Sequence, residues 1–121
     1  MKHILYVDDD AHSGVLLKIY LEKAGFRVSV CRDTGKARNI LAGNKIDCII
    51  TDVGLPGESG LGFYEWLQNS DFKSIPVLIV SAHAIGFDHI LVEHKDIFLE
   101  KPILFPLLID RLNKIFGKKK D

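Results

Sequence analysis

The sequence predicts a doubly wound α/β fold with one five-stranded parallel sheet. Short apolar segments alternate five times with segments whose apolar residues have helical spacing, and the connections are short. Two apolar segments, at residues 48–50 and 77–80, are unbroken runs, as expected of strands buried on both faces of a parallel sheet. We expect one domain over residues 1–121, because a chain of this length has room for a single core.

Each expected strand ends where its apolar residues stop. The third strand ends at Asp52, because Gly54 and Pro56 prevent its continuation. The fourth strand ends at Ser81, and the fifth ends just before Lys101. The expected strands cover residues 3–7, 26–31, 47–52, 77–81 and 97–100.

The first two expected helices begin at residues that cap helices well. Asp10 or Ser13 suits the start of the first helix, and Gly25 suits its end. Asp33 or Thr34 suits the start of the second helix. The residues at helical spacing are Leu16, Leu17, Tyr20, Leu21 and Ala24 in the first helix, and Ala37, Ile40 and Leu41 in the second.

Three further helices are expected in the second half of the chain. The third follows Gly60 and directs inward the residues Leu61, Tyr64 and Leu67. Residues 84–94 have helical spacing but contain Gly86, which weakens the prediction. Pro106 suits the first turn of the last helix. The core residues expected in this helix are Leu108, Leu112 and Ile115.

Composition argues against several classes of partner and location. The 16 basic and 16 acidic residues cancel, so bulk charge favours neither direct nucleic-acid binding nor an anionic membrane. No stretch approaches the roughly 20 apolar residues of a membrane span, and the apolar N-terminal segment is too short for a signal peptide. We therefore expect a cytoplasmic protein, with the basic tail 117–121 as a solvated end or the start of a linker.

The alternating pattern is that of flavodoxin-like folds, whose strand order is 2-1-3-4-5. In this order Cys31 and Cys48 lie on strands separated by the first strand, about 9.5 Å apart and beyond disulfide reach. Both are expected to be reduced core thiols.

Four strands are followed or ended by functional groups, and parallel strands bring these groups to one edge of the sheet. The groups are Asp8-Asp9-Asp10, Asp52, Ser81 and Lys101. Clustered carboxylates repel one another and favour a hard divalent cation such as Mg²⁺, which also neutralises an incoming phosphoryl group. Lys101 supplies a cation, Ser81 a hydroxyl donor and Asp52 a nucleophilic oxygen, which is the set that phosphoryl transfer requires.

Over essentially its whole length the sequence resembles the response-regulator receiver domains of two-component signalling. The residues that carry the resemblance are Asp8, Asp9, Asp52 with Leu55-Pro56-Gly57 and Gly60, Ser81 with Ala82, and Lys101-Pro102. The resemblance implies that Asp52 is phosphorylated from a histidine kinase or a phosphotransfer protein. It also implies Mg²⁺ bound by Asp9, Asp52 and the carbonyl of Gly54, with Asp8 assisting through water, and a cis Lys101-Pro102 bond.

The resemblance further implies a switch. Ser81 would move toward the phosphoryl group, Phe98 would turn inward, and the surface of residues 84–94, 97–100 and 106–115 would change for partners. Such a domain catalyses only its own phosphorylation and dephosphorylation and is otherwise no enzyme. The segment 103–109 contains more apolar residues than one buried helix face requires. The excess is consistent either with a homodimer or partner surface or with packing against the rest of the domain.

The sequence departs from the usual receiver pattern at two positions that influence phosphoryl lifetime, Gly54 and His83. Three other functions remain open. A flavin- or nucleotide-binding module is disfavoured because Asp8-Asp9-Asp10 would repel phosphate without a metal, and a phosphatase is disfavoured because Gly54 cannot serve as a second acid. A degenerate receiver that acts without phosphorylation is the remaining alternative.

Overall fold

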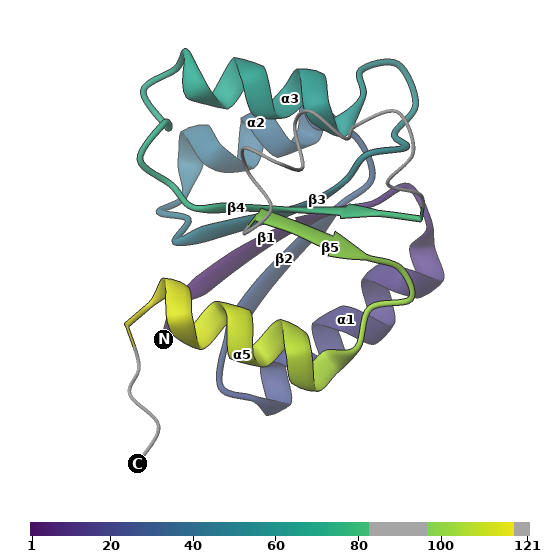
Figure 1. Ribbon diagram of the computed structural model, residues 1–121. Coiled ribbons are helices and arrows are strands. Elements are labelled where there is room, and N and C mark those ends of the chain that lie inside the picture. The colour runs from purple at the N-terminus through teal and green to yellow at the C-terminus, as the bar shows by residue number, and fades with distance from the viewer. Residues whose placement is uncertain (83–96, 118–121) are drawn as a thin grey trace.

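The computed structural model describes residues 1–82 and 97–117. The elements are β1 (His3–Val7), α1 (Ala11–Lys23), β2 (Arg27–Cys31), α2 (Thr34–Gly43), β3 (Cys48–Asp52), α3 (Gly60–Gln68), β4 (Val77–Ser81), β5 (Phe98–Glu100) and α5 (Phe105–Ile115). All five strands are parallel and lie in the order β2-β1-β3-β4-β5, which confirms the predicted fold (Figure 1). The helix expected over residues 84–94 and the tail residues 118–121 lie outside the described residues.

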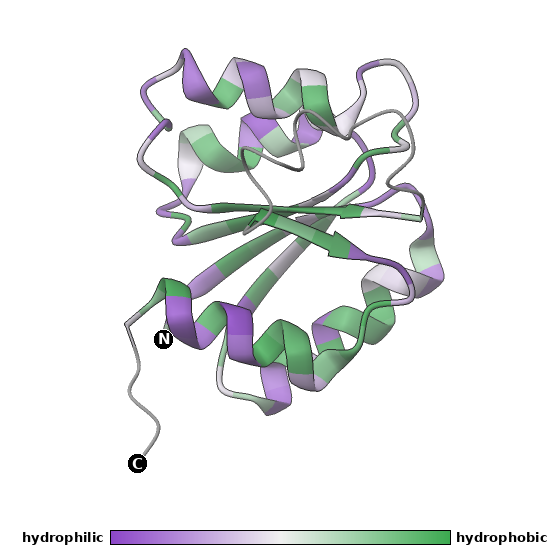
Figure 2. Cartoon of the chain, in the orientation of Figure 1, coloured by the Kyte–Doolittle hydropathy of each residue, from purple (hydrophilic) through white to green (hydrophobic). Residues whose placement is uncertain are grey.

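The sheet separates two apolar cores. Side chains of β1 alternate between them, with Ile4 and Tyr6 facing α1 and α5, and Leu5 and Val7 facing α2 and α3. Every residue of β1, β3 and β4 is buried, and Figure 2 shows these strands as mostly hydrophobic. Because β1 and β3 are central and neighbouring, their carboxyl ends place Asp8 and Asp52 in the middle of one sheet edge.

Capping residues define where three helices begin. The side chain of Asp10 accepts a hydrogen bond from the His12 amide, and that of Asp33 accepts one from the Lys36 amide. Of the two candidate capping residues that the sequence offered for each of these helices, the aspartate is the one that caps. Ser59 caps α3 and was not predicted, because glycines surround it in the sequence. Pro106 lies in the first turn of α5, as predicted.

Two helices bury only some of the residues that the spacing predicted. In α3, Leu67 is buried as predicted, but the other buried large side chain is Phe63, which was not predicted, and Leu61 and Tyr64 are half-buried against the same core. In α1, Leu17 and Leu21 are buried as expected. The other three residues of the predicted spacing are exposed, namely Leu16, Tyr20 and Ala24. In α5, Leu108 and Leu112 are buried and Ile115 is half-buried.

The cysteines are free and buried, on β2 and β3 with β1 between them, as predicted. Burial raises the pKa of the Cys31 thiol to about 11 and that of Cys48 to about 12, so both are protonated at neutral pH. Among the described helices, none combines the length and the apolar character that crossing a membrane requires.

Candidate phosphoacceptor and metal site

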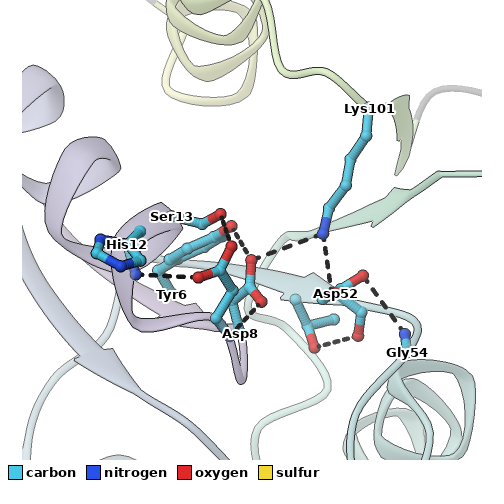
Figure 3. A network of polar contacts seen from close by, with 9 residues as sticks. Tyr6, Asp8, His12, Ser13, Asp52, Gly54 and Lys101 are labelled. Atoms are coloured by element: carbon cyan, nitrogen blue, oxygen red, sulfur yellow. Dashed lines mark hydrogen bonds and ion pairs between the residues drawn. The ribbon is translucent and has the colours of Figure 1, made fainter.

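Three side chains from three strand ends meet at the carboxyl edge of the sheet. The Lys101 ammonium lies 3.0 Å from Asp52 Oδ2 and 3.7 Å from Asp8 Oδ2 (Figure 3). Asp8 is almost fully buried, Asp52 is buried with 11% of its side chain exposed, and the Lys101 side chain is 29% exposed. The predicted convergence of these residues, which lie up to 93 positions apart, is therefore present in the structure.

Asp8 is held from two further sides. The Tyr6 hydroxyl donates to Asp8 Oδ2 at 2.6 Å, and the Asp10 amide donates to Asp8 Oδ1 at 3.0 Å. Burial and the hydrogen bond to Asp8 raise the pKa of Tyr6 well above its ordinary value, so the phenol keeps its proton. Asp8 is thus a fixed carboxylate rather than a mobile one.

Asp9 is the exposed carboxylate of the set. Its backbone carbonyl accepts hydrogen bonds from Arg32 Nε at 3.3 Å and Arg32 Nη2 at 3.2 Å, which ties the loop after β1 to the end of β2. One oxygen each of Asp8, Asp9 and Asp52 lies within 4.8 Å of the others. Three converging carboxylates, one of them open to solvent, are a donor set that fits Mg²⁺, which prefers oxygen ligands and retains several waters.

Lys101 balances this negative charge. Burial by itself lowers the pKa of an ammonium group, but the hydrogen bond to Asp52 and the charges of Asp8, Asp52 and Asp10 outweigh it and raise the pKa of Lys101. The Lys101 amide donates to the Ser81 carbonyl at 2.8 Å, so Ser81 and Lys101 are neighbours at the ends of β4 and β5. The Lys101-Pro102 bond is cis, which confirms that prediction.

The loop from Val53 to Ser59 begins directly after Asp52. Its ends are pinned, because the Val53 amide donates to the Val80 carbonyl at 3.1 Å and the Gly60 amide donates to the Val53 carbonyl at 2.9 Å. Gly60 must lack a side chain, since a Cβ there would collide with the carbonyl oxygen of Asp52. Gly54 has open space around it, and its amide approaches Asp52 Oδ1 at 3.4 Å. Gly54 therefore leaves the approach to Asp52 clear.

The sequence of this chain matches the model of the response regulator receiver domain family over residues 4–113. The chain belongs to this family. The match spans every element described above except the first residue of β1 and the last two of α5, so the receiver domain includes all the residues of the candidate site.

Curated relatives of the receiver domain differ in length. Protein PetR of Rhodobacter capsulatus is 35% identical over 118 residues, which are 96% of this chain and 49% of PetR. Transcriptional regulatory protein CpxR of Escherichia coli is 32% identical over 98% of this chain and 50% of CpxR. The polar-differentiation response regulator DivK of Brucella anthropi is 27% identical over 96% of this chain and 97% of DivK. The chain thus spans about half the length of PetR and CpxR and nearly all of DivK.

Solved receiver domains share the fold closely. The receiver domain of Francisella response regulator 1452 matches with a TM-score of 0.86 and 27% identity, over 99% of this chain and 100% of that one. A response regulator receiver protein from Pseudomonas putida matches with a TM-score of 0.85 and 28% identity, over 93% and 96% of the two chains.

The two predicted switch residues differ in setting. Ser81 is buried at the end of β4, and Phe98 is buried on β5 in the core that faces α2 and α3. Their movement on phosphorylation stays a prediction. His83 lies outside the described residues.

Two residues of the site were missed from the sequence. Tyr6 looked like an ordinary core residue of β1, and Arg32 looked like a solvated residue after β2. The charged sequence neighbours of Tyr6 were the only available signal, because its hydroxyl needs a partner when buried.

An apolar surface adjoins the site. Six of the seven exposed large hydrophobic side chains among the described residues lie on α1 or at the start of α5. They are Val15, Leu16, Ile19, Tyr20, Leu104 and Leu107, and we call them the α1–α5 patch. Tyr20 stacks on Phe105 with ring centroids 4.1 Å apart, which joins the two helices. A cavity of about 540 Å³ is lined by Leu16 and Phe105 together with Tyr6 and Lys101, so it connects one residue of the patch, Leu16, with the site.

Proposed function

We propose that this receiver domain accepts a phosphoryl group on Asp52 from the phosphohistidine of a histidine kinase or phosphotransfer protein. The observation that carries the proposal is the contact of Lys101 with both Asp52 and Asp8 at an edge where three carboxylates converge. A partly exposed carboxylate beside a cation can act as a nucleophile, whereas a purely structural ion pair needs no third, solvent-open carboxylate.

In the transfer step a carboxylate oxygen of Asp52 attacks phosphorus as the phosphorus–nitrogen bond to the donor imidazole breaks. The imidazole leaves with the electron pair, and an acyl phosphate remains on Asp52. Lys101 is already within hydrogen-bond distance of Asp52, so it can follow the charge onto the new phosphoryl oxygens. Its raised pKa keeps it cationic across the physiological range.

Asp8, Asp9 and Asp52 would hold Mg²⁺, with the Gly54 carbonyl as a further ligand. When bound, the ion neutralises charge on the incoming phosphoryl group and on the carboxylates around it. Tyr6 and the Asp10 amide hold Asp8, and Arg32 holds the backbone of Asp9, so the chain keeps two of the ligands in place. Ser81 would donate its hydroxyl to the phosphoryl group.

The α1–α5 patch supports a protein as the donor. α1 is apolar on its outer face as well as on the face against the sheet, which is typical of a helix that is covered by a partner. Because the cavity beside Leu16 opens to Lys101, a helix docked on this patch could bring an imidazole to Asp52. A small phosphate donor would need no such surface.

The output is the proposed change of the surface of β5 and α5, through Ser81 and Phe98; residues 84–94, which the sequence also assigns to the output, lie outside the described residues. This surface would bind an output partner or a second copy of the chain. The domain would catalyse only its own phosphorylation and dephosphorylation, in the cytoplasm.

The test is incubation with acetyl phosphate and Mg²⁺ followed by intact mass measurement. We expect the mass to rise by one phosphoryl group in the wild type and not in Asp52→Asn. EDTA should abolish the adduct, because Asp8 and Asp9 then lack their ion. Absence of an adduct in the wild type would favour the degenerate receiver.

A further inference from the structure

One arginine joins α2 to the loop that precedes α3, on the face of the sheet opposite the α1–α5 patch. Arg38 Nη2 donates to Glu58 Oε1 at 2.7 Å, and both side chains are about one third exposed. Figure 1 shows α2 and α3 side by side over the same face of the sheet. Glu58 is the second-last residue of the loop that starts after Asp52 and includes Gly54.

Arg38 is itself held in one orientation. Its guanidinium lies over the Trp66 ring, with Cζ 4.5 Å from the centroid, and 5.7 Å from the centroid of Phe63. Its other terminal nitrogen approaches Thr34 Oγ1 at 3.5 Å. Phe63 and Trp66 are themselves stacked, with ring centroids 6.1 Å apart. A planar group that is stacked and hydrogen-bonded on two sides loses little further entropy when it also holds Glu58.

The middle of the loop is held at two points. Its ends are pinned at Val53 and Gly60, but the part between them contains two glycines, and Gly57 adopts a positive φ of 79°. The Leu55 side chain is buried and its amide donates to the Val53 carbonyl at 3.0 Å, which anchors the part of the loop around Gly54. The ion pair of Glu58 with Arg38 anchors a second point, on the far side of Gly57. Leu55 thus restrains the part of the loop that contains Gly54, and the ion pair restrains the part after Gly57, so the conformation of the whole loop depends on both contacts.

We propose that Arg38 is a positioning residue for the cation site: by holding Glu58 it keeps the loop in the conformation in which the Gly54 carbonyl and Asp52 take a divalent cation together. The inference rests on the proposed function, because it requires that Asp8, Asp9 and Asp52 bind Mg²⁺. It assigns a role to a residue on α2 that is not itself a ligand.

The sign of the effect separates this role from a simple charge effect. Loss of a positive charge near a cation site should, by Coulomb interaction alone, tighten Mg²⁺ binding. Loss of a positioning contact should weaken it, because a smaller fraction of molecules then has the binding-competent loop. The two explanations thus predict opposite changes of the same dissociation constant.

The experiment is calorimetric titration of Mg²⁺ into the wild type, Arg38→Gln, Arg38→Lys and the control Lys36→Gln. Lys36 is an exposed cation on the same helix, and its side chain forms no ion pair among the described residues. We expect Arg38→Gln to weaken Mg²⁺ binding about threefold to fivefold, the effect of losing a partly buried ion pair that orders the loop. Arg38→Lys keeps the charge but loses the planar stack, and we expect a similar weakening. Lys36→Gln should bind as tightly as the wild type or slightly more tightly.

Two controls make the result decisive. Thermal unfolding in EDTA measures the structural effect of each variant separately, and emission of Trp66, the only tryptophan, reports loss of the stack. If the wild type binds Mg²⁺ and both Arg38 variants bind it equally well or more tightly, the inference is overturned while the proposed function stands. If the wild type itself binds no Mg²⁺, the proposed cation site is wrong and the inference is overturned with it.

Discussion

The two faces of the sheet have similar cores but different outer surfaces. Beneath the helices, each face buries a continuous apolar cluster. On the α2–α3 side, polar and aromatic contacts such as Arg38 with Glu58 and Trp66 tie the helices to the loop after Asp52. On the α1–α5 side, large apolar side chains are left exposed, and one of them, Leu16, lines a cavity that Lys101 also lines. One face therefore restrains the site, and the other face offers access to it.

The largest effect on stability is expected at Gly60, where α3 approaches the backbone of β3 most closely. Gly60→Ala would place a Cβ against the Asp52 carbonyl oxygen and 2.8 Å from the Asp52 carbonyl carbon, and backbone atoms cannot yield as side chains do. We expect a loss of about 3 kcal/mol in the free energy of unfolding, measured by urea denaturation. Gly54→Ala is the matched control in the same loop, because nothing lies within 4 Å of its position. Equal stability of the two variants would contradict the tight approach of α3 to β3.

A smaller effect on stability is expected at Tyr6, which lies in the core under α1 and α5 and donates a hydrogen bond to Asp8. Tyr6→Phe removes the buried donor to Asp8, and we expect a loss of about 2 kcal/mol at neutral pH, as for a hydrogen bond to a charged group. Because burial and the bond to Asp8 raise the pKa of Tyr6, its stabilisation is fully present below the ordinary pKa of 10.0 and is lost as pH rises above it. The difference between the wild type and Tyr6→Phe should therefore shrink from pH 7 to about pH 11. A difference that is constant over this range would contradict the assignment.

The accessible side can be tested by placing charge on the α1–α5 patch. Ile19→Glu should slow phosphoryl transfer from an autophosphorylated donor kinase about tenfold, because a buried interface position would then hold an unpaired charge. Loading from acetyl phosphate should be unchanged, since a small donor does not contact the patch. Asn39→Glu places the same charge on the exposed face of α2 and should change neither rate. Equal transfer to all three proteins would place the donor elsewhere.

The contrast between the faces also explains what the sequence could predict. Strand positions and the convergence of Asp8, Asp52, Ser81 and Lys101 followed from apolar runs and from the rule that parallel strands end at one edge. These features depend on local pattern and topology, so they were predicted correctly.

Contacts between elements were the part that could not be predicted. Which residues of α3 are buried depends on how the helix is rotated against the sheet, and spacing alone predicted Leu67 correctly but missed Phe63. The pairing of Arg38 with Glu58 depends on how α2 and α3 lie together, and each residue alone resembles a solvated charge. Leu16 and Tyr20 have helical spacing but are exposed, because spacing does not show how much of the helix surface the sheet covers.

The smallest effect on stability is expected at Gly14 of α1, which packs closely against β2 as Gly60 of α3 packs against β3. An added Cβ would lie 2.8 Å from Val30 Cγ1, which is a side-chain atom of a half-buried residue rather than backbone. Alanine is the better helix former by about 1 kcal/mol, and a shift of Val30 to a less favourable rotamer costs about the same. We therefore expect Gly14→Ala to change the free energy of unfolding by less than about 1 kcal/mol. A loss as large as that of Gly60→Ala would show that α1 is packed as rigidly against β2 as α3 is against β3. The proposed difference between the two faces would then be confined to their exposed side chains.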